Sequence, residues 1–194
     1  MTDERVALLG PESAAVAAEA GVPGYFADVN LYRALLRHPA LAKRIADLVV
    51  QLWRRSTLDA RLRELIIMRV AWLTGCEYEW AHHWPMALKL GITADELAAV
   101  RDWRAFDGFG PADAGVLAAA DETLSAGAVS DGTWKLLTDH VGDTPVVLEV
   151  LATISCWRTV SELLRSMRVP LEDGFISWPP NGVPPEPREA GCLS

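Results

Sequence analysis

The sequence predicts an all-α fold, a single helical domain of about seven or eight helices with extended N- and C-terminal arms. Apolar residues recur every three or four positions through most of the chain between Tyr25 and Val169. Residues that typically start and stop helices stand at the ends of these segments. No run of alternating apolar and polar residues bounded by turn residues indicates a strand. At 194 residues, 51% of them hydrophobic, the chain is long enough to bury one core.

The first helices follow an arm. Residues 1–24 are rich in alanine and glycine and are predicted to form an N-terminal arm with one short helix near Glu12–Glu19. The leucines of the first domain helix recur at helical spacing: Leu31, Leu35 and Leu36. A break at His38-Pro39 separates this helix from the second. The apolar residues of the second helix are Leu41, Ile45, Leu48, Val49 and Leu52.

A third helix is expected to be central and buried. From Leu65 to Leu73 only Arg69 interrupts an apolar run, and a helix that is apolar on nearly all faces is a buried one. A short buried strand is the competing interpretation. The alanine, leucine and arginine residues before the run, and the length from Leu58 to Thr74, favour a helix that ends at Gly75.

Start and stop signals place the remaining helix ends. Starts are predicted at Ser56 or Thr57 with Asp59 in the first turn, at the capping box Thr93-Ala94-Asp95-Glu96, at Gly110-Pro111, at Ser130-Asp131 and at Thr144-Pro145. The fourth helix runs from about Cys76 to Leu90, with Gly91 as its C-terminal cap. The last predicted helix, which begins at Thr144-Pro145, carries one apolar stripe that continues to Met167. Repeated prolines after Pro170 predict an extended tail, so the expected division is 1–24, 25–169 and 170–194.

Composition and charge exclude several classes of protein. The 18 basic and 26 acidic residues give a net charge of −8, which argues against a nucleic-acid partner. No uncharged apolar run is long enough for a transmembrane helix, and the N-terminal sequence does not resemble a signal peptide. The three cysteines, Cys76, Cys156 and Cys192, are scattered and form no disulfide framework. We therefore expect a cytoplasmic protein that does not bind a membrane.

The stretch that carries chemistry combines a thiol, two carboxylates and paired histidines. Cys76, Glu79 and His83 are spaced i, i+3 and i+7, so they form one stripe of the fourth helix. His82 faces another direction. If the third and fourth helices pack antiparallel, Glu64 approaches His83.

This stretch resembles the carboxymuconolactone decarboxylase and alkylhydroperoxidase D-like superfamily. The signature of the peroxidase branch is a glutamate, eleven residues, a Cys-x-x-Cys pair, three residues and a histidine. Glu64, Cys76, Glu79 and His83 match every spacing, but the second cysteine is replaced by Glu79. The flanking sequence from Tyr78 to His83 and from Ala87 to Glu96 is also similar. The motif core spans about Leu58–Val100, and the helix plan resembles the family's over most of Tyr25–Val169.

The resemblance implies two branches of activity. In the peroxidase branch one thiolate attacks a hydroperoxide and the second cysteine forms a disulfide with it, which Glu79 cannot do. Glu77 and Glu79 also oppose the thiolate that the helix dipole would favour at Cys76. The decarboxylase branch implies a cofactor-free acid–base site built on the histidine with a glutamate near it. Family members are commonly trimers or hexamers, so a homo-oligomer is expected.

Each candidate residue also has a structural interpretation. Glu64 could pair with Arg61, Arg63 or Arg69 on the helix surface, and Cys76 could be a small buried apolar residue. Glu79 could be a solvated acid in the first helical turn. Of the residues expected to bind substrate, Tyr78 and Trp84 could instead belong to the core, and His82 could be solvated. Adjacent histidines point about 100° apart on a helix, so no metal is expected.

Three functions remain open from the sequence. The leading hypothesis is a cofactor-independent enzyme, lyase-like, in which His83, oriented by Glu64, moves a proton to or from carbon of a small organic acid, lactone or related carbonyl substrate. The second is a one-cysteine alkylhydroperoxide reductase, with peroxiredoxin-like activity at Cys76 and an external thiol. The third is a non-catalytic helical oligomer.

Overall fold

The computed structural model describes residues 4–186, and within this range the fold is all-helical, as predicted. In chain order the α-helices are α1 (Ser13–Ala20), α2 (Asn30–Leu35), α3 (Pro39–Arg54), α4 (Ala60–Thr74), α5 (Glu77–Lys89), α6 (Ala94–Ala99), α7 (Pro111–Ala126), α8 (Asp131–His140) and α9 (Thr144–Met167). Two short 3₁₀-helices, η1 (Gly24–Phe26) and η2 (Val100–Ala105), complete the described elements. Eight of the α-helices, α2 to α9, lie in the domain predicted for 25–169, and α1 is the short helix expected in the arm.

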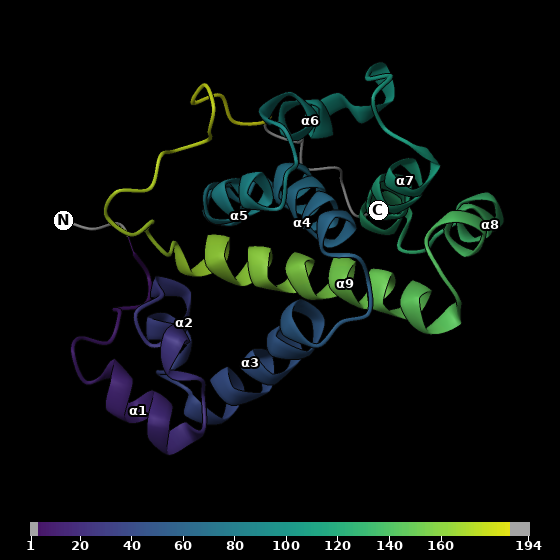
Figure 1. Ribbon diagram of the computed structural model, residues 1–194. Helices are drawn as coiled ribbons and strands as arrows, with labels where there is room; N and C mark the ends of the chain where they lie inside the picture. The colour runs from purple at the N-terminus through teal and green to yellow at the C-terminus, as the bar shows by residue number, and fades with distance from the viewer. Residues whose placement is uncertain (1–3, 187–194) are drawn as a thin grey trace, which may run out of the picture.

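Helix α4 is the centre of the molecule. Residues 62–71 are all buried, because α5, α7 and α9 pack around this helix (Figure 1). The prediction of a buried central helix is confirmed and the strand alternative is wrong. A helix enclosed in this way holds any polar side chain that it carries in a rigid, dry position, which matters for Glu64.

The start of α4 differs from the prediction. Asp59, and not Ser56 or Thr57, is the N-cap residue, and its carboxylate accepts hydrogen bonds from the backbone N–H groups of Arg61 and Leu62. Ser56 and Thr57 are held elsewhere, since both hydroxyls donate to Glu149 of α9, at 2.7 and 3.0 Å. The predicted cap was wrong because a carboxylate distant in sequence binds those hydroxyls.

Gly75 turns the chain back from α4 into α5. It has φ of 64°, in the left-handed region that glycine adopts without strain, and it satisfies the last carbonyls of α4. Cys76 follows as the N-cap residue of α5. The two helices therefore pack antiparallel, as the sequence suggested.

Both arms, as far as they are described, fold back on the domain. In the N-terminal arm, the carbonyls of Ala7 and Leu9 accept hydrogen bonds from Arg37 and Arg33 of the α2 region. In the C-terminal tail, Trp178 is buried against Trp72 and Trp80, and Trp80 donates its indole N–H to the carbonyl of Pro179 at 2.7 Å. In Figure 1 the tail runs from the end of α9 past α5 toward α6. Residues 1–3 and 187–194, with Cys192, lie outside the described range.

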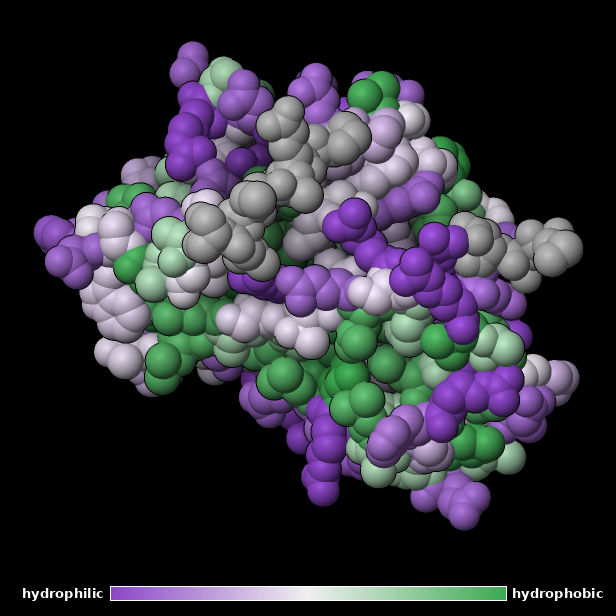
Figure 2. All heavy atoms as spheres, turned by 180° about the vertical axis from the view of Figure 1, so that it is seen from behind, coloured by the Kyte–Doolittle hydropathy of each residue, from purple (hydrophilic) through white to green (hydrophobic). Residues whose placement is uncertain are grey.

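One face of the molecule gathers exposed apolar side chains. Figure 2 shows hydrophobic side chains collected on the lower part of the face opposite to that of Figure 1. Leu41 and Leu48 of α3 are among the exposed large apolar residues. Across residues 4–186, no helix is both long and apolar enough to cross a membrane.

The Asp59 cap gives a test of the helix start. Replacing Asp59→Ala removes the acceptor for two N–H groups and should lower the free energy of unfolding by about 1 kcal/mol, measured by urea denaturation. Asp59→Asn keeps an acceptor at the cap and is the matched control, with a smaller expected loss. Equal stability of the alanine variant and the parent protein would contradict this assignment.

Candidate active site

The antiparallel packing of α4 and α5 brings Glu64 against His83. The Nδ1 atom of His83 lies 2.6 Å from Oε2 of Glu64, and this N–H donates to the carboxylate. Glu64 is only 1% exposed and His83 is also buried. Behind Glu64, Arg63 approaches the other carboxylate oxygen at 3.8 Å. A buried carboxylate on one ring nitrogen fixes the orientation of the imidazole and directs Nε2 away from Glu64.

Two groups face the second nitrogen of His83. Oε2 of Glu79 lies 3.3 Å from Nε2, and the indole N–H of Trp157 in α9 lies 3.2 Å from the same atom. These contacts suit different protonation states. A protonated Nε2 donates to Glu79, whereas an unprotonated Nε2 accepts from Trp157.

The electrostatic balance favours the protonated imidazole. Burial acts against the charged form, but Glu64, followed by Glu79, outweighs it and raises the pKa of His83 to about 10. Trp157 opposes this shift, because its N–H can donate only to the neutral ring. Both ring nitrogens of His83 therefore carry a proton at neutral pH. The carboxylate of Glu79, next to Nε2, can accept one of them.

His83 and Glu79 open onto a small cavity, here called the motif cavity, with a volume of about 230 Å³. Its lining residues are Tyr25, Phe26, Val29, Leu31, Tyr32, Val49, Trp53, Tyr78, Glu79, His82, His83, Met86, Trp157 and Val160. They come from η1, α2, α3, α5 and α9, and most are aromatic or aliphatic. Glu64 is not among them, so it acts on the cavity through His83.

Cys76 is close to the motif in sequence but does not line the motif cavity. It is 1% exposed, at the start of α5. Burial, and then the charge of Glu79, raise the pKa of its thiol to about 12. Burial and Glu79 raise the pKa of Cys156 to about 12 as well. Both cysteines are free and poorly disposed to form a thiolate.

A second histidine–carboxylate pair adjoins the first. His82 Nε2 lies 2.6 Å from Oε2 of Glu172, a residue of the C-terminal tail. The hydroxyl of Tyr78 donates to the same carboxylate, as does the backbone N–H of Asn30. The ring of His82 is sandwiched between Tyr78 and Phe175, with centroids 4.3 and 4.0 Å away. The tail is thereby pinned over the end of α5.

The structure places the predicted site residues in different surroundings. Glu64, Glu79 and His83 meet, and Tyr78 and His82 line the motif cavity. Trp84 does not line it and packs against Trp80 in the core. Of the three arginines considered as ion-pair partners of Glu64, Arg63 comes within 3.8 Å of its carboxylate, in a buried position and not on the helix surface. Arg61 pairs instead with Glu96 and Asp113, and Arg69 pairs with Asp121.

Sequence reasoning missed Trp157, Tyr32 and Glu172. Trp157 belongs to the apolar stripe of α9 and was expected in the core, while Tyr32 and Glu172 carried no motif. Glu172 stands between Leu171 and Asp173, and a carboxylate in a proline-rich tail gives no signal of a partner on a distant helix. Among residues 4–186, no group of three or more His, Cys, Asp or Glu side chains is arranged to hold a metal ion.

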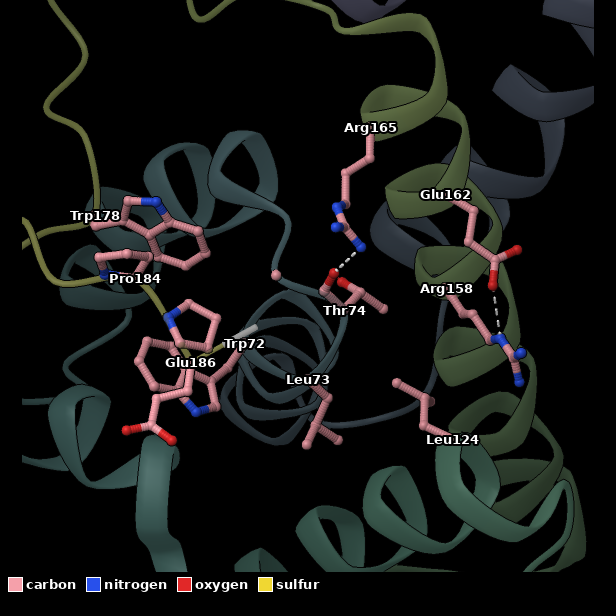
Figure 3. Close-up of a pocket in the computed structure, with 12 residues that line it drawn as sticks. Trp72, Leu73, Thr74, Leu124, Arg158, Glu162, Arg165, Trp178, Pro184 and Glu186 are labelled. Atoms are coloured by element: carbon pink, nitrogen blue, oxygen red, sulfur yellow. Dashed lines mark hydrogen bonds and ion pairs between the residues drawn. The ribbon is translucent and has the colours of Figure 1, made fainter. Parts of the chain in front are cut away.

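A larger groove of about 730 Å³ lies elsewhere and contains none of Glu64, Glu79 or His83. Figure 3 shows that three of its charged side chains have partners: Arg158 pairs with Glu162, and Arg165 donates to the carbonyl of Thr74. Glu186, the last described residue, lies on its rim. The chemistry therefore points to the smaller motif cavity.

The comparisons with known proteins agree with this fold and motif. Residues 39–122 match the carboxymuconolactone decarboxylase family. A peroxidase-related protein from Ralstonia eutropha with an alkylhydroperoxidase AhpD core superposes with a TM-score of 0.75 at 15% identity, covering 93% of this chain and 97% of that one. A variant of the debrominase Bmp8, in complex with 2,3,4-tribromopyrrole, superposes with a TM-score of 0.72 at 16% identity, covering 87% and 91%. No curated protein sequence matches the chain.

The match over residues 39–122 and the shared fold support a likeness to the carboxymuconolactone decarboxylase and AhpD-like superfamily. An enzyme of this superfamily fits both the family match and the similar structures, which include a debrominase and peroxidase-related proteins.

The groups around His83 predict pKa changes of opposite sign. Glu64→Gln should lower the pKa of His83, because it removes the negative charge at Nδ1. Trp157→Phe should raise it, because it removes the donor that favours the neutral ring. The histidine ring protons, followed by NMR across pH 5–11, report both changes. Glu162→Gln, in an exposed pair with Arg158, is the control and should leave the titration unchanged. Equal titration in all four proteins would contradict the geometry.

The hydrogen bonds that hold Glu172 of the tail against the domain predict a stability that falls in acid. Burial acts against ionisation of Glu172, but hydrogen bonds from His82, Tyr78 and Asn30 prevail and lower its pKa from 4.5 to about 2. Because the folded pKa is depressed, the stabilisation is complete above about pH 4.5 and is lost as the pH falls toward 2.

Glu172→Gln tests this dependence by urea denaturation. The variant should be less stable than the parent protein at pH 6, and the difference should shrink at pH 3. Other carboxyl groups titrate in both proteins and cancel in the comparison. If the difference in free energy of unfolding stays constant or grows toward pH 3, the contacts of Glu172 do not have the proposed effect.

Proposed function

We propose that the protein is a cofactor-independent acid–base enzyme that acts on a small carbonyl, lactone or organic acid substrate in the motif cavity. The observation that carries this proposal is the line Glu64–His83–Glu79, in which one buried imidazole joins two carboxylates and only His83 and Glu79 reach the cavity. His83 as proton donor and Glu79 as proton acceptor lie 3.3 Å apart at a largely apolar cavity. Such a pair can remove a proton from carbon and return one to it.

The proton route follows from the positions of these groups. Glu79 takes a proton from a carbon next to the substrate carbonyl, and the electron pair of the C–H bond moves onto the carbonyl oxygen. His83 then delivers the proton from Nε2 to another carbon of the conjugated system, and Glu79 returns its proton to His83. For an acid substrate, the bond to carbon dioxide breaks instead and its electrons move onto the same carbonyl oxygen. His83 then protonates the carbon that lost carbon dioxide, and water restores the proton on Nε2.

Glu64 sets the orientation and the protonation state of His83. Its charge offsets the burial of the imidazole and holds Nδ1–H, so the proton that moves is the one on Nε2. A His83 pKa near 10 makes the ring a weak acid in the resting state. Transfer to a carbanion remains favourable, because a carbanion next to a carbonyl is a much stronger base than imidazole.

The thiol alternative has less support. A peroxidase needs an accessible thiolate, whereas Cys76 is buried, lies outside the cavity lining and has a raised pKa. The position of the resolving cysteine holds Glu79. The tribromopyrrole complex of the debrominase shows only that this fold can hold a small ring in a relative, which supports a ring-sized substrate here.

The test compares two activities in four proteins. Parent, His83→Ala, Glu79→Gln and Cys76→Ser proteins are assayed for decarboxylation or isomerisation of unsaturated lactones and keto acids, and for dithiol-dependent reduction of hydrogen peroxide and organic hydroperoxides. Acid–base turnover should fall at least 100-fold in the first two variants, since general acid–base groups contribute about 10²–10⁴-fold. It should persist in Cys76→Ser.

Peroxide reduction that disappears in Cys76→Ser would overturn the proposal in favour of the thiol. Absence of every activity, together with indifference to His83→Ala, would favour a non-catalytic role. The homo-oligomer and the cytoplasmic location remain predictions.

A further inference from the structure

The motif cavity contains a polar group that the proton route does not use. Tyr32 of α2 lines the cavity and is 2% exposed, and its hydroxyl has no hydrogen-bond partner among the described residues. Its ring is fixed, since it stacks on Phe26 with centroids 4.0 Å apart and planes 13° from parallel. Leaving a buried hydroxyl unpaired is costly, so such a group in a binding cavity indicates a partner supplied by the ligand.

The hydroxyl of Tyr32 stays protonated near neutral pH, so it can donate a hydrogen bond to a ligand. Burial raises the pKa of Tyr32 above its usual value, and the neighbouring Cys156 and Glu79 add to the shift. Tyr32 and Glu79 line the same cavity, so a ligand that reaches Glu79 and His83 with its reacting carbon can meet Tyr32 with an oxygen.

The charges of the cavity bear on the charge of the ligand. Each histidine in the lining already has a carboxylate partner: His83 has Glu64 and Glu79, and His82 has Glu172. No arginine or lysine is among the lining residues of this cavity in the described chain. Arg54 lies over the rings of Tyr25 and Trp53 but is itself exposed. A bound carboxylate would therefore find no free cation, and desolvating it would be costly.

The volume and the lining residues of the motif cavity indicate the size and shape of the ligand. The lining includes six aromatic side chains, from Tyr25, Phe26, Tyr32, Trp53, Tyr78 and Trp157. An apolar cavity of about 150 Å³ in another protein holds one benzene molecule, so about 230 Å³ accommodates a substituted six-membered ring. Aromatic walls favour a planar ligand, which can stack on them.

We propose that Tyr32 is a substrate-binding residue whose hydroxyl donates a hydrogen bond to the carbonyl oxygen of an uncharged, planar, ring-sized substrate in the motif cavity. The inference rests on the proposed function for the identity of the site and narrows it to uncharged carbonyl or lactone compounds. The same hydrogen bond strengthens when negative charge develops on that oxygen, so Tyr32 stabilises the enolate that proton removal creates.

The test is a binding experiment with matched probes. Acetophenone carries a carbonyl on a ring, and ethylbenzene has nearly the same shape without the oxygen. Isothermal titration gives the affinity of each for the parent protein, Tyr32→Phe and Trp134→Phe. Trp134 lies in α8, is 39% exposed and does not line the motif cavity, so this aromatic substitution is the control.

The expected result is a selective loss. Tyr32→Phe should weaken acetophenone about two- to tenfold, the worth of one neutral hydrogen bond, and leave ethylbenzene unchanged or slightly stronger. Trp134→Phe should change neither. Benzoate and benzylammonium, assayed with the parent protein, should both bind more weakly than acetophenone.

Equal losses for acetophenone and ethylbenzene in Tyr32→Phe, or no loss for either, would overturn the role of the hydroxyl. Tighter binding of benzoate or benzylammonium than of acetophenone would overturn the uncharged class. Because binding is measured without turnover, a protein that shows the Tyr32 effect but no acid–base activity separates failure of the proposed function from failure of this inference.

Discussion

The site depends on one buried contact, the hydrogen bond from His83 Nδ1 to Glu64. A carboxylate that is 1% exposed is costly to bury unless it is compensated, and here a histidine and, at a longer distance, Arg63 compensate it. The contact is possible because α4 is enclosed on all sides and because Gly75 folds α5 back along it. Once the first nitrogen of the imidazole is held, the second must face Trp157, Glu79 and the motif cavity. The chemistry is therefore a consequence of how two helices pack.

The exchange of a cysteine for Glu79 changes what this arrangement can do. A thiol at this position would offer sulfur to a partner thiol, whereas a carboxylate 3.3 Å from Nε2 offers only proton exchange and charge. The same carboxylate contributes to the raised pKa of both Cys76 and Cys156. In the proposed function, one residue thus supplies an acid–base group and also disfavours the thiolate form of the neighbouring cysteines. The two effects are coupled because both arise from a single negative charge in an environment with little water.

The sequence predicted most of the fold and half of the site. Helical periodicity and caps placed α2 to α9, since those signals are local, and the spacing of Glu64 and His83 across one turn was enough to predict their meeting. The start of α4 was misplaced because Glu149, from α9, binds Ser56 and Thr57. Tyr32, Trp157 and Glu172 could not be found for the same reason. Tyr32 and Trp157 reach the cavity from α2 and α9, and Glu172 binds His82 from the tail. No local pattern encodes which distant segments meet in this way.

The two neighbouring histidines of α5 also differ in how much chain separates them from their carboxylates. His83 and Glu64 are 19 residues apart, whereas His82 and Glu172 are 90 apart. Closing a short loop costs less conformational entropy than closing a long one, and local contacts form faster. During folding, the acid–base pair can therefore assemble within a single helical hairpin while the wall around it is still open. We expect the contact between Glu172 and His82 to form later, because it joins segments far apart in the sequence.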